Sequence, residues 1–466
     1  MSNILKEYFD SIARQRTKWK KKNWYYHKLL EKYYCFFIPE DSHVLEIGCG
    51  TGELLNAVEP KCGVGIDFSP EMIAIATNRF KNISFEIQNA EEIDLKSKFD
   101  FIIISDLLCS LQDIQKMFRN LNHLVNSKTK IIISNYNYLW EPIIKLGERI
   151  GLKEKQPLMN WLSVKDIENL LYLEGFEIIK VEHKILFPKF IPLIGVFFNS
   201  FLANLPLVRK LCLVNFIIAR KIEHPNINYS VSIIIPCRNE KGNIENAIIR
   251  TPCFGAWQEF IFVEGNSQDG TYEEILRVKE KYSDKNIVVL KQSGKGKGNA
   301  VREGFDKATG DVLMIIDADL TMPPEELPKY YDALVLNKGE FINGCRIVYP
   351  MEGQAMRFLN LIANKLFGML FTYLLCQNLK DTLCGTKALF RSDYEKIKKD
   401  RSYFGDFDPF GDFDLLFGAS KQNLKIVEIP IRYHDRQYGE TQIKRFTHGW
   451  LLIKMSFFAA RKIKFI

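Results

Sequence analysis

The chain has 466 residues, of which 47% are hydrophobic and 26% are charged, and its net charge is +8. Because a single hydrophobic core rarely grows beyond about 250–300 residues, this length favours two domains. The composition is that of an ordinary globular protein rather than of a disordered or fibrous one. The ten cysteines lack metal-type or paired spacing, so we expect reduced core or turn residues in a cytosolic protein, as at Cys49, Cys345 and Cys384. The N-terminus is polar and charged, so we expect no signal peptide.

Basic residues concentrate near the two ends of the chain, in Arg14–Lys22 and Lys444–Ile466. Such clusters can meet anionic lipid or nucleic acid, or can form a solvated face. No recognised nucleic-acid-binding fold surrounds the first cluster, so we expect no nucleic-acid partner. Two apolar segments, Phe190–Val208 and Phe358–Cys376, approach the length of a membrane span, but polar residues interrupt both. We expect helices at a membrane surface or lid helices, with plain core helices as the alternative.

Strand-like runs alternate with helical stretches in the first half of the chain. These runs are Val44–Ile47, Val64–Asp67, Ser84–Ile87, Phe101–Ser105 and Ile131–Ser134. The alternation predicts a parallel α/β sheet. The first run leads into a glycine loop before a helical stretch, and such a loop lets a ligand approach the backbone near a helix N-terminus.

The glycine spacing separates two kinds of nucleotide site. A dinucleotide-binding loop would need glycine where Glu53 stands. The observed Glu46-x-Gly48-x-Gly50-x-Gly52 instead resembles the first motif of class I S-adenosylmethionine-dependent methyltransferases. The resemblance implies a Rossmann-like domain over residues 1–222, with late antiparallel strands at Phe176–Val181 and Leu211–Ala219. It also implies that S-adenosylmethionine is the cofactor, with these contacts: Glu46, Gly48, Gly50 and Gly52 in the loop, Asp67 at the ribose, and Asn89 and Ala90 at the adenine.

The methyl acceptor is open at this stage. Tyr136 and Trp140 lie where family members often contact the acceptor, and they fit equally well as packing residues at the sheet edge. Methyl transfer to a good nucleophile needs positioning more than acid–base groups, and the sequence offers no obvious general base here. An alternative is that this half is a non-catalytic docking or regulatory module.

The second half begins after a charged stretch that contains Pro and Asn. We place a linker at residues 223–229 and a second domain at residues 230–466. Strand-like Ser232–Pro236 and Phe260–Val263 each end in a polar loop, and "GKGKGNAVREGFDKATGDVLMIIDADL" follows. This order resembles family 2 glycosyltransferases of the GT-A fold, so the expected architecture is α/β with two domains. The resemblance implies a nucleotide-diphospho-sugar donor contacted by Pro236, Glu240, Glu264, Lys297, Asp317 and Arg436, although only one of the two usual acids, Glu264, is present in its loop.

Two carboxylates, Asp317 and Asp319, follow a buried strand. The leaving diphosphate of a sugar donor carries negative charge, and a hard divalent cation bound to carboxylates offsets such charge. The sequence therefore predicts a Mg²⁺ or Mn²⁺ site. By resemblance Asp319 is the direct ligand and Asp317 faces the ribose or a metal-bound water. Thr321 stands where mannosyl members often have glutamine, which leaves a third ligand open.

The acceptor is suggested by "DTLCGTKALFR" (Asp381–Arg391) and "IPIRYHDRQYGETQI" (Ile429–Ile443). The first stretch resembles the acceptor-side motif of dolichyl-phosphate glucosyltransferase-like enzymes, and the second resembles the C-terminal loop of the same family. The stretch "DADLTMPPEEL", which begins at Asp317, resembles polyprenyl- or dolichyl-phosphate sugar synthases, and the reaction implied is inverting. The resemblance implies a polyprenyl phosphate acceptor held by Arg346 and Arg357, closure of Arg436 over the diphosphate, and Asp319, Asp381 and Asp414 as the catalytic set. The rival is a glycan hydroxyl in surface polysaccharide synthesis, with Asp412 or Asp414 as base. We expect a cytoplasmic protein, peripheral on the inner face of the membrane, because the C-terminal "GWLLIKMSFFAARKIKF" combines aromatic and basic residues.

Overall fold

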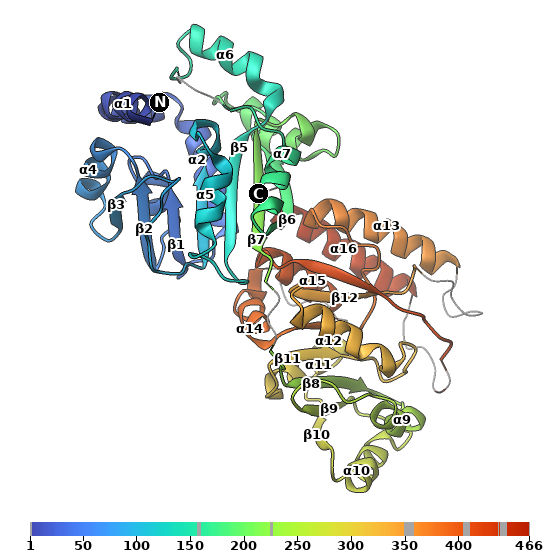
Figure 1. Cartoon of the computed structure of the whole chain (residues 1–466). Helices are drawn as coiled ribbons and strands as arrows, with labels where there is room; N and C mark the ends of the chain where they lie inside the picture. The colour runs from blue at the N-terminus through green and yellow to red at the C-terminus, as the bar shows by residue number, and fades with distance from the viewer. Residues whose placement is uncertain are drawn as a thin grey trace. The chain divides into compact units, whose positions relative to one another are not determined.

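A computed structural model describes residues 2–155, 160–223, 227–348, 358–403, 411–436, 438 and 445–465. The chain divides into two compact units, Met1–Glu223 and His224–Lys464, with the last residues assigned individually. We refer to them as the N-terminal unit and the C-terminal unit (Figure 1). Each is an α/β unit built on a seven-stranded sheet, which confirms the predicted fold class.

The sheet of the N-terminal unit has the strand order β3-β2-β1-β4-β5-β7-β6. Strands β1 to β5 pair in parallel, whereas β7 is antiparallel to both β5 and β6. The predicted first five strands and the late antiparallel pair are therefore confirmed. The strand bounds are β1 His43–Ile47, β2 Cys62–Asp67, β3 Ser84–Ile87, β4 Phe101–Ser105, β5 Lys130–Tyr136, β6 Phe176–Lys184 and β7 Val214–Lys221.

Helices connect these strands and follow the signals of the sequence. Ser69 caps α4 by accepting from the Met72 N–H, and Ser163 begins α7 with a capping box. The helical bounds are α1 Ser2–Lys22, α2 Trp24–Phe37, α3 Glu53–Ala57, α4 Pro70–Arg79, η1 Leu108–Ser110, α5 Ile114–Leu121, η2 Tyr138–Trp140, α6 Glu141–Arg149, α7 Val164–Leu173, α8 Ile194–Ser200, η3 Leu202–Asn204 and η4 Val208–Leu211. The sequences of the central strands β4 and β5 contain continuous isoleucine runs, because both faces of these strands are buried.

The sheet of the C-terminal unit has the strand order β10-β9-β8-β11-β13-β12-β14. Strands β10, β9, β8 and β11 are parallel, β13 is antiparallel to both its neighbours, and β14 is parallel to β12. The carboxyl ends of β8, β9 and β11 therefore meet at one edge, where ligands bind in open α/β sheets. The strand bounds are β8 Val231–Cys237, β9 Gln258–Glu264, β10 Asn286–Lys291, β11 Val312–Ile315, β12 Phe341–Cys345, β13 Lys387–Phe390 and β14 Ile426–Pro430.

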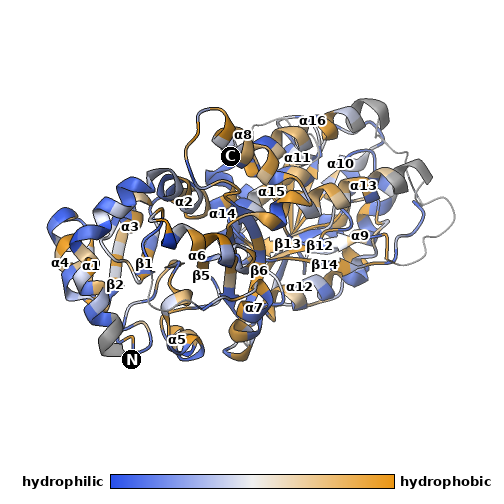
Figure 2. Ribbon diagram, turned by 90° about the horizontal axis from the view of Figure 1, so that it is seen from above, coloured by the Kyte–Doolittle hydropathy of each residue, from blue (hydrophilic) through white to orange (hydrophobic). Residues whose placement is uncertain are grey.

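Two hydrophobic clusters fill the C-terminal unit, and both include residues of its sheet. In Figure 2 the strands around β12 and β13 carry mostly hydrophobic residues, whereas α1 of the other unit is hydrophilic over much of its length. The helical bounds are η5 Lys241–Asn243, α9 Ile244–Ile249, α10 Thr271–Lys281, α11 Lys297–Lys307, η6 Pro324–Glu326, α12 Leu327–Val335, α13 Phe358–Leu375, α14 Arg391–Lys399, η7 Arg401–Tyr403, α15 Asp412–Lys421 and α16 Arg445–Ile463.

The two long apolar segments form different structures. Residues 190–208 form α8 and short 3₁₀ turns with many exposed apolar side chains, among them Leu193 at 86%. The second segment is the single helix α13, which buries Phe371 and Leu374 in the core. No described helix combines the length and apolar content needed to cross a membrane. The described cysteines form no disulfide, and Cys49, Cys345 and Cys384 are buried.

Candidate active sites of the two units

The glycine loop of the N-terminal unit follows β1 and turns into α3. Gly48, Gly50 and Gly52 have φ angles of +73°, +52° and +79°, which glycine adopts readily and other residues rarely do. The Gly50 N–H donates to Oδ2 of Asp67 at 2.8 Å, so the loop is fastened to the end of the neighbouring strand β2. The sequence therefore needs glycine here for backbone geometry as well as for ligand approach.

Two buried carboxylates support this loop. Asp67 is 8% exposed and also accepts from the Ser69 N–H at 3.0 Å, and burial raises its pKa. Glu46 is 3% exposed, and its Oε2 accepts no hydrogen bond from the described residues. Burial raises the pKa of Glu46 to about 8, against a smaller opposite effect of Lys20. A polar atom left unpaired inside a protein is costly, which marks Glu46 as a residue kept for a ligand or a bound water.

A cavity of about 510 Å³ lies beside the loop. This volume is in the usual range of small-molecule sites. The structure brings most of the predicted cofactor and acceptor residues to its wall, whereas Glu46 and Gly52 are not among its lining residues. The predicted residues that line it are Gly48, Gly50, Asp67, Asn89, Ala90, Tyr136 and Trp140.

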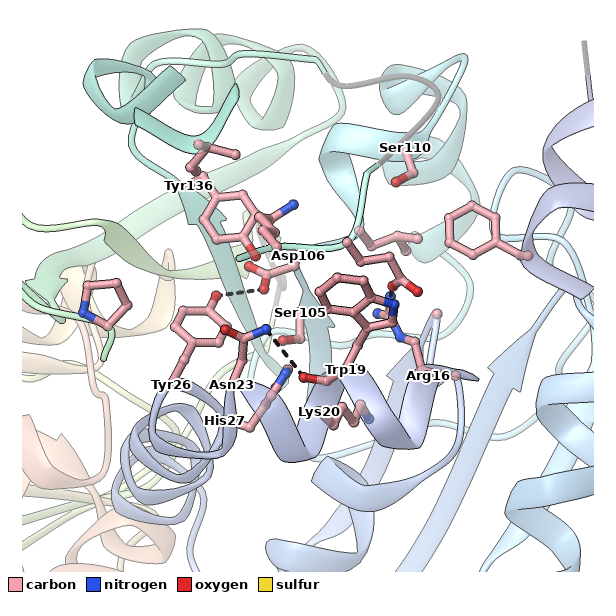
Figure 3. Close-up of a pocket in the computed structure, with 18 of the residues that line it drawn as sticks. Arg16, Trp19, Lys20, Asn23, Tyr26, His27, Ser105, Asp106, Ser110 and Tyr136 are labelled. Carbon is pink, nitrogen blue, oxygen red and sulfur yellow. Dashed lines mark hydrogen bonds and ion pairs between the residues drawn. The ribbon is translucent and has the colours of Figure 1, made fainter. Parts of the chain in front are cut away.

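Helix α1 forms part of the cavity wall, which the sequence did not predict. Its residues Arg16, Trp19 and Lys20 line the cavity (Figure 3). Arg16 pairs with Glu154 at 3.0 Å, and Lys20 pairs with Glu53 at 2.6 Å. The basic cluster at Arg14–Lys22 is therefore partly folded against the unit. Trp19 and Lys20 follow Arg16 by three and four residues, so all three share one face of the helix. This spacing was the sequence signal that could have indicated a cavity wall.

Asp106, directly after β4, is a second residue that the sequence analysis missed. Figure 3 shows it between Tyr26 and Tyr136, and the Tyr26 hydroxyl donates to Asp106 Oδ2 at 2.7 Å. Burial raises the pKa of Asp106, and burial also raises the pKa of each tyrosine. His27 lines the same cavity, and burial together with Lys20 and Arg16 lowers its pKa to about 3. The histidine is therefore neutral at physiological pH.

The residues of this site fit S-adenosylmethionine. Three glycines leave the backbone open to a ligand, and Asp67 supplies carboxylate oxygens at the strand end where a ribose would lie. A Cβ at position 48 would come within 2.8 Å of Leu107 Cδ1, so the loop lies tightly against the segment after β4. These features agree with the implied contacts of Gly48, Gly50 and Asp67.

In the C-terminal unit, Asp317 lies just after β11 and pairs with Lys297 at the start of α11. Lys297 Nζ lies 2.5 Å from Asp317 Oδ1. Burial would raise the pKa of Asp317, but Lys297, and beyond it Lys387 and Arg346, lower it below the ordinary value. A Cβ on Gly385 would collide with both Asp317 and Lys297. The loop before β13 therefore closes over this pair only because residue 385 is glycine.

Asp319 is bound to a cation from the C-terminal segment. Its Oδ2 lies 2.7 Å from Arg436, and its Oδ1 accepts from the Thr321 hydroxyl at 2.8 Å. Arg436 also pairs with Glu240 at 2.8 Å, so one guanidinium bridges two predicted donor-site acids. Burial raises the pKa of Glu240, and Arg436 opposes that effect. Arg436, Asp319 and Glu240 are thus brought together although they are far apart in the chain, and closure of Arg436 over a diphosphate stays a prediction.

The carboxylates fit a hard divalent cation by their chemistry. Within the described ranges, no three His, Cys, Asp or Glu side chains are grouped to hold a metal ion. Mg²⁺ is commonly held by one or two carboxylates while substrate phosphates and waters complete its shell. Asp317 and Asp319 could supply such a pair, provided that Lys297 and Arg436 give up their present contacts.

The predicted nucleotide contacts lie at the ends of neighbouring strands. Pro236 is opposite Val263 in the parallel β8–β9 pair, and Glu264 is the last residue of β9. Glu264 is 4% exposed and accepts from the Ser267 N–H at 2.5 Å, which shapes the loop after β9. These residues therefore share the sheet edge at which β11 leads to Asp317.

Asp381 is placed as the partner of an arginine rather than as a proton acceptor. Arg346 donates to it through its side chain at 2.7 and 2.8 Å and through its backbone N–H at 2.9 Å, and Asn364 donates at 2.8 Å. Burial would raise the pKa of Asp381, but Arg346 lowers it to about 2. A carboxylate with this pKa is a poor base at neutral pH. This arrangement fits a role in holding Arg346, and the catalytic role of Asp381 stays a prediction.

The two candidate bases near α15 are also paired. Asp412 lies 2.7 Å from Lys387, and Asp414 lies 3.2 Å from Arg401. All four side chains are mostly or fully buried. Arg357, the second residue predicted to hold the acceptor phosphate, lies outside the described residues.

Two family models match different parts of the chain. Residues 232–398 match the glycosyl transferase family 2, and residues 18–181 match a methyltransferase domain family. Among solved structures, a Thermotoga maritima S-adenosylmethionine-dependent methyltransferase, a possible histamine N-methyltransferase, gives a TM-score of 0.38 at 17% identity, over 47% of this chain and 99% of that chain. The glucosyl-3-phosphoglycerate synthase of Mycobacterium tuberculosis gives a TM-score of 0.37 at 18% identity, over 49% of this chain and 78% of that chain.

Curated relatives match the second half. A dolichol-phosphate mannosyltransferase of Pyrococcus furiosus is 30% identical over 247 residues, which are 50% of this chain and 67% of that protein. The Saccharomyces cerevisiae dolichol-phosphate mannosyltransferase is 38% identical over 23% of this chain and 42% of its own length. An undecaprenyl-phosphate 4-deoxy-4-formamido-L-arabinose transferase of Edwardsiella ictaluri is 25% identical over 46% of this chain and 62% of its own length. The chain therefore belongs to glycosyl transferase family 2 through its C-terminal unit, resembles polyprenyl-phosphate sugar transferases there, and carries a methyltransferase domain in its N-terminal unit.

Proposed function

We propose that the chain is a bifunctional enzyme. Its C-terminal unit transfers a sugar from a nucleotide-diphospho-sugar to a polyprenyl phosphate, and its N-terminal unit transfers a methyl group from S-adenosylmethionine to a separate acceptor. The observation that carries the first activity is the grouping of Asp317, Asp319, Glu240 and Arg436 at the carboxyl edge of β8 and β11. Similarity to dolichol-phosphate mannosyltransferases supports the lipid-phosphate acceptor.

The donor site combines two neighbouring carboxylates with an arginine that exchanges its present partner for the donor. Asp319 and Asp317 would hold a divalent ion, and such an ion would offset the charge that builds up on the leaving diphosphate. Arg436 moves from Asp319 to the diphosphate, since a guanidinium binds phosphate oxygens as a planar fork. Pro236 and Glu264 contact the nucleotide at the neighbouring strand ends. The acceptor displaces the diphosphate in a single inverting step.

The acceptor site favours an anion. A phosphate is already a nucleophile and needs no strong base, and in this proposal it is bound by Arg346, which Asp381 holds, and by Arg357. The rival acceptor, a glycan hydroxyl, would need a base such as Asp412 or Asp414. Both of these are paired with buried or nearly buried cations, which weakens that alternative.

A donor screen tests the sugar transfer. Purified full chain is incubated with labelled UDP- and GDP-sugars, Mg²⁺ and polyprenyl phosphate, and release of nucleotide diphosphate and of lipid-linked sugar is measured. Asp319→Asn should lower transfer at least about 100-fold, since it removes the main metal ligand. Asp306→Asn is the matched control, because Asp306 is exposed and pairs with Lys398 on the surface at 2.8 Å. No transfer from any donor by folded protein would refute the lipid-acceptor proposal.

Calorimetry with S-adenosylmethionine separates a working methyltransferase from a docking module. Binding that Asp67→Ala abolishes supports the cofactor site, because Asp67 fastens the glycine loop and lines the cavity. No binding to the wild-type chain would favour the non-catalytic module.

Peripheral attachment to the inner face of the membrane is part of the proposal. In α16, Trp450, Ile453 and Phe457 are 61%, 51% and 78% exposed, and their spacing places them on one side of the helix. Arg461 and Lys462 follow in the last turn. Such a stripe suits the interface of an anionic bilayer. Co-sedimentation with anionic vesicles should drop when Trp450 and Phe457 are both changed to serine, and unchanged binding would contradict this role.

A further inference from the structure

The cavity of the N-terminal unit holds a carboxylate in an unusual backbone conformation. Asp106 directly follows β4 and has a φ of +51°, a region that residues other than glycine rarely adopt. Its N–H donates to the Ser134 carbonyl at 2.9 Å, so the backbone is tied to β5. Non-glycine residues held in this region cluster at functional sites, where the surrounding structure maintains them.

One oxygen of the Asp106 carboxylate accepts a hydrogen bond from a tyrosine, and the other oxygen accepts none from the described residues. The Tyr26 hydroxyl from α2 donates to Oδ2 at 2.7 Å. Oδ1 is buried and accepts no hydrogen bond from any residue in the described part of the chain. Tyr136, from the end of β5, lies on the other side of Asp106 in the cavity (Figure 3). A buried, unpaired carboxylate oxygen beside a ligand cavity is a candidate proton acceptor.

The surroundings of Asp106 adjust its basicity from several elements. Burial raises its pKa, while Tyr26, Lys153, Arg16 and Tyr136 lower it to a smaller extent. Cys109 of η1 lies close enough for the carboxylate to raise the pKa of the thiol. The net effect is a pKa above that of an ordinary aspartate, which makes the carboxylate a stronger base. His27, another titratable group of the cavity, is weakened as a base by its low pKa.

We propose that Asp106 is the general base of methyl transfer and that the acceptor is a neutral hydroxyl group. This inference rests on the proposed methyltransferase function. As the acceptor oxygen bonds to the methyl carbon, its O–H bond breaks and the proton passes to Asp106 Oδ1. S-adenosylmethionine, when bound, supplies the methyl group, and its sulfur keeps the electron pair of the broken carbon–sulfur bond. Tyr26 holds the carboxylate in place during the transfer.

The charges and the rim of the cavity favour this class of acceptor. A carboxylate acceptor would be repelled by Asp106, and it would need no base. An ammonium acceptor would face Arg16 and Lys153, which act on Asp106 although they also pair with Glu154 and Glu148. Ile143, Leu146 and Ile150 of the α6 region line the cavity and are 56%, 57% and 61% exposed, so the opening is apolar. The hydroxyl is therefore carried by a molecule with an apolar body.

The first test labels the natural acceptor with full-length protein. The chain and methyl-tritiated S-adenosylmethionine are incubated with a chloroform–methanol extract of the organism from which the sequence comes. A methyl ether resists mild alkali, a methyl ester releases volatile tritiated methanol, and a methylated amine binds a cation exchanger. We expect an alkali-stable product that is not retained. Asp106→Asn should lower labelling at least about 100-fold, as expected for loss of a general base. Asp113→Asn is the matched control, since Asp113 caps α5 and asparagine also caps helices.

Two further readouts separate a base from a structural residue. Calorimetry should show affinity for S-adenosylmethionine within about threefold of wild type in Asp106→Asn, because Tyr26 and Tyr136 keep the cavity in shape. NMR of protein labelled with ¹³C at the aspartate carboxyls, compared with Asp106→Asn, should show one cavity carboxyl that titrates above the ordinary range.

Each outcome decides a different question. Absence of labelling by folded wild-type protein would overturn the methyltransferase function and this inference with it. Labelling that survives in Asp106→Asn, an alkali-labile or amine product, or an ordinary titration would overturn the inference alone.

Discussion

Replacing Asp381 with asparagine should destabilise the C-terminal unit, because Asp381 neutralises Arg346 inside the protein. The two side chains are 0% and 12% exposed, and three donors of Arg346 reach the carboxylate at 2.7–2.9 Å. Asparagine keeps the shape but removes the negative charge. The guanidinium is then left with no counter-charge at 381.

The size of the effect follows from the pKa of Asp381. Against burial, Arg346 lowers this pKa from the ordinary 3.8 to about 2. That difference corresponds to about 2 kcal/mol of folding free energy at neutral pH. Removing one partner of a buried pair typically costs about 3–5 kcal/mol, because the other charge remains. We therefore expect a loss of about 3 kcal/mol.

The same pair predicts a dependence on pH. A carboxyl whose pKa is lower in the folded state stabilises the protein above its unfolded pKa. This contribution is lost as the pH falls from about 4 towards about 2. Asp381→Asn should lack that part of the acid sensitivity. If the wild-type protein instead became more stable than Asp381→Asn as the pH fell, burial would destabilise the ionised carboxyl more than Arg346 stabilises it.

Pulse proteolysis of the full chain in urea measures the effect, since two units need not unfold together. Fragments of the C-terminal unit are followed, with Asp306→Asn as the exposed control. Adding Arg346→Gln to Asp381→Asn should recover part of the loss, because no buried charge then remains. A loss below about 1 kcal/mol in the single variant would refute the reasoning, since exposed ion pairs have that magnitude.

Three other changes have defined outcomes. Gly385→Ala should weaken donor binding in calorimetry at least about tenfold, because its Cβ would collide with Asp317 and Lys297; unchanged affinity would show that the loop can shift. Glu46→Gln should raise the melting temperature of the N-terminal unit at about pH 8 and have little effect at about pH 5, because burial raises the pKa of Glu46 to about 8 and its ionisation costs stability as pH rises; equal effects at both pH values would contradict this. Asp67→Ala should weaken S-adenosylmethionine binding at least about tenfold by calorimetry, since the Gly50 N–H loses its partner; wild-type affinity would remove Asp67 from the site.

The parts of the fold that the sequence predicted are those controlled by neighbouring residues. Continuous apolar runs gave β1, β4 and β5 because both faces of a central parallel strand are buried. Asp317 and Asp67 were located because each ends such a run, and the carboxyl ends of parallel strands gather at one edge.

Pairings between distant residues could not be predicted in this way. Asp106 bonds to Tyr26, which lies 80 positions earlier, and Arg436 bonds to Glu240, 196 positions away. Asp381 belongs to a motif for which the sequence predicted a catalytic role. Only the structure shows that the carboxylate of Asp381 is paired with Arg346. Burial and partner identity decide whether an acid is a base or a counter-ion, and both depend on tertiary packing.

The position of α1 has a kinetic consequence. Arg16 and Lys20 fasten this helix beside the cavity through ion pairs with Glu154 and Glu53, at 3.0 and 2.6 Å. All four side chains retain some contact with solvent, so dissolved salt weakens these attractions. If the helix must lift for a ligand to pass, association and dissociation rates will both rise with ionic strength. The equilibrium affinity will then change less than either rate. The residence time of a ligand will depend on the salt concentration of the buffer as well as on the contacts within the cavity.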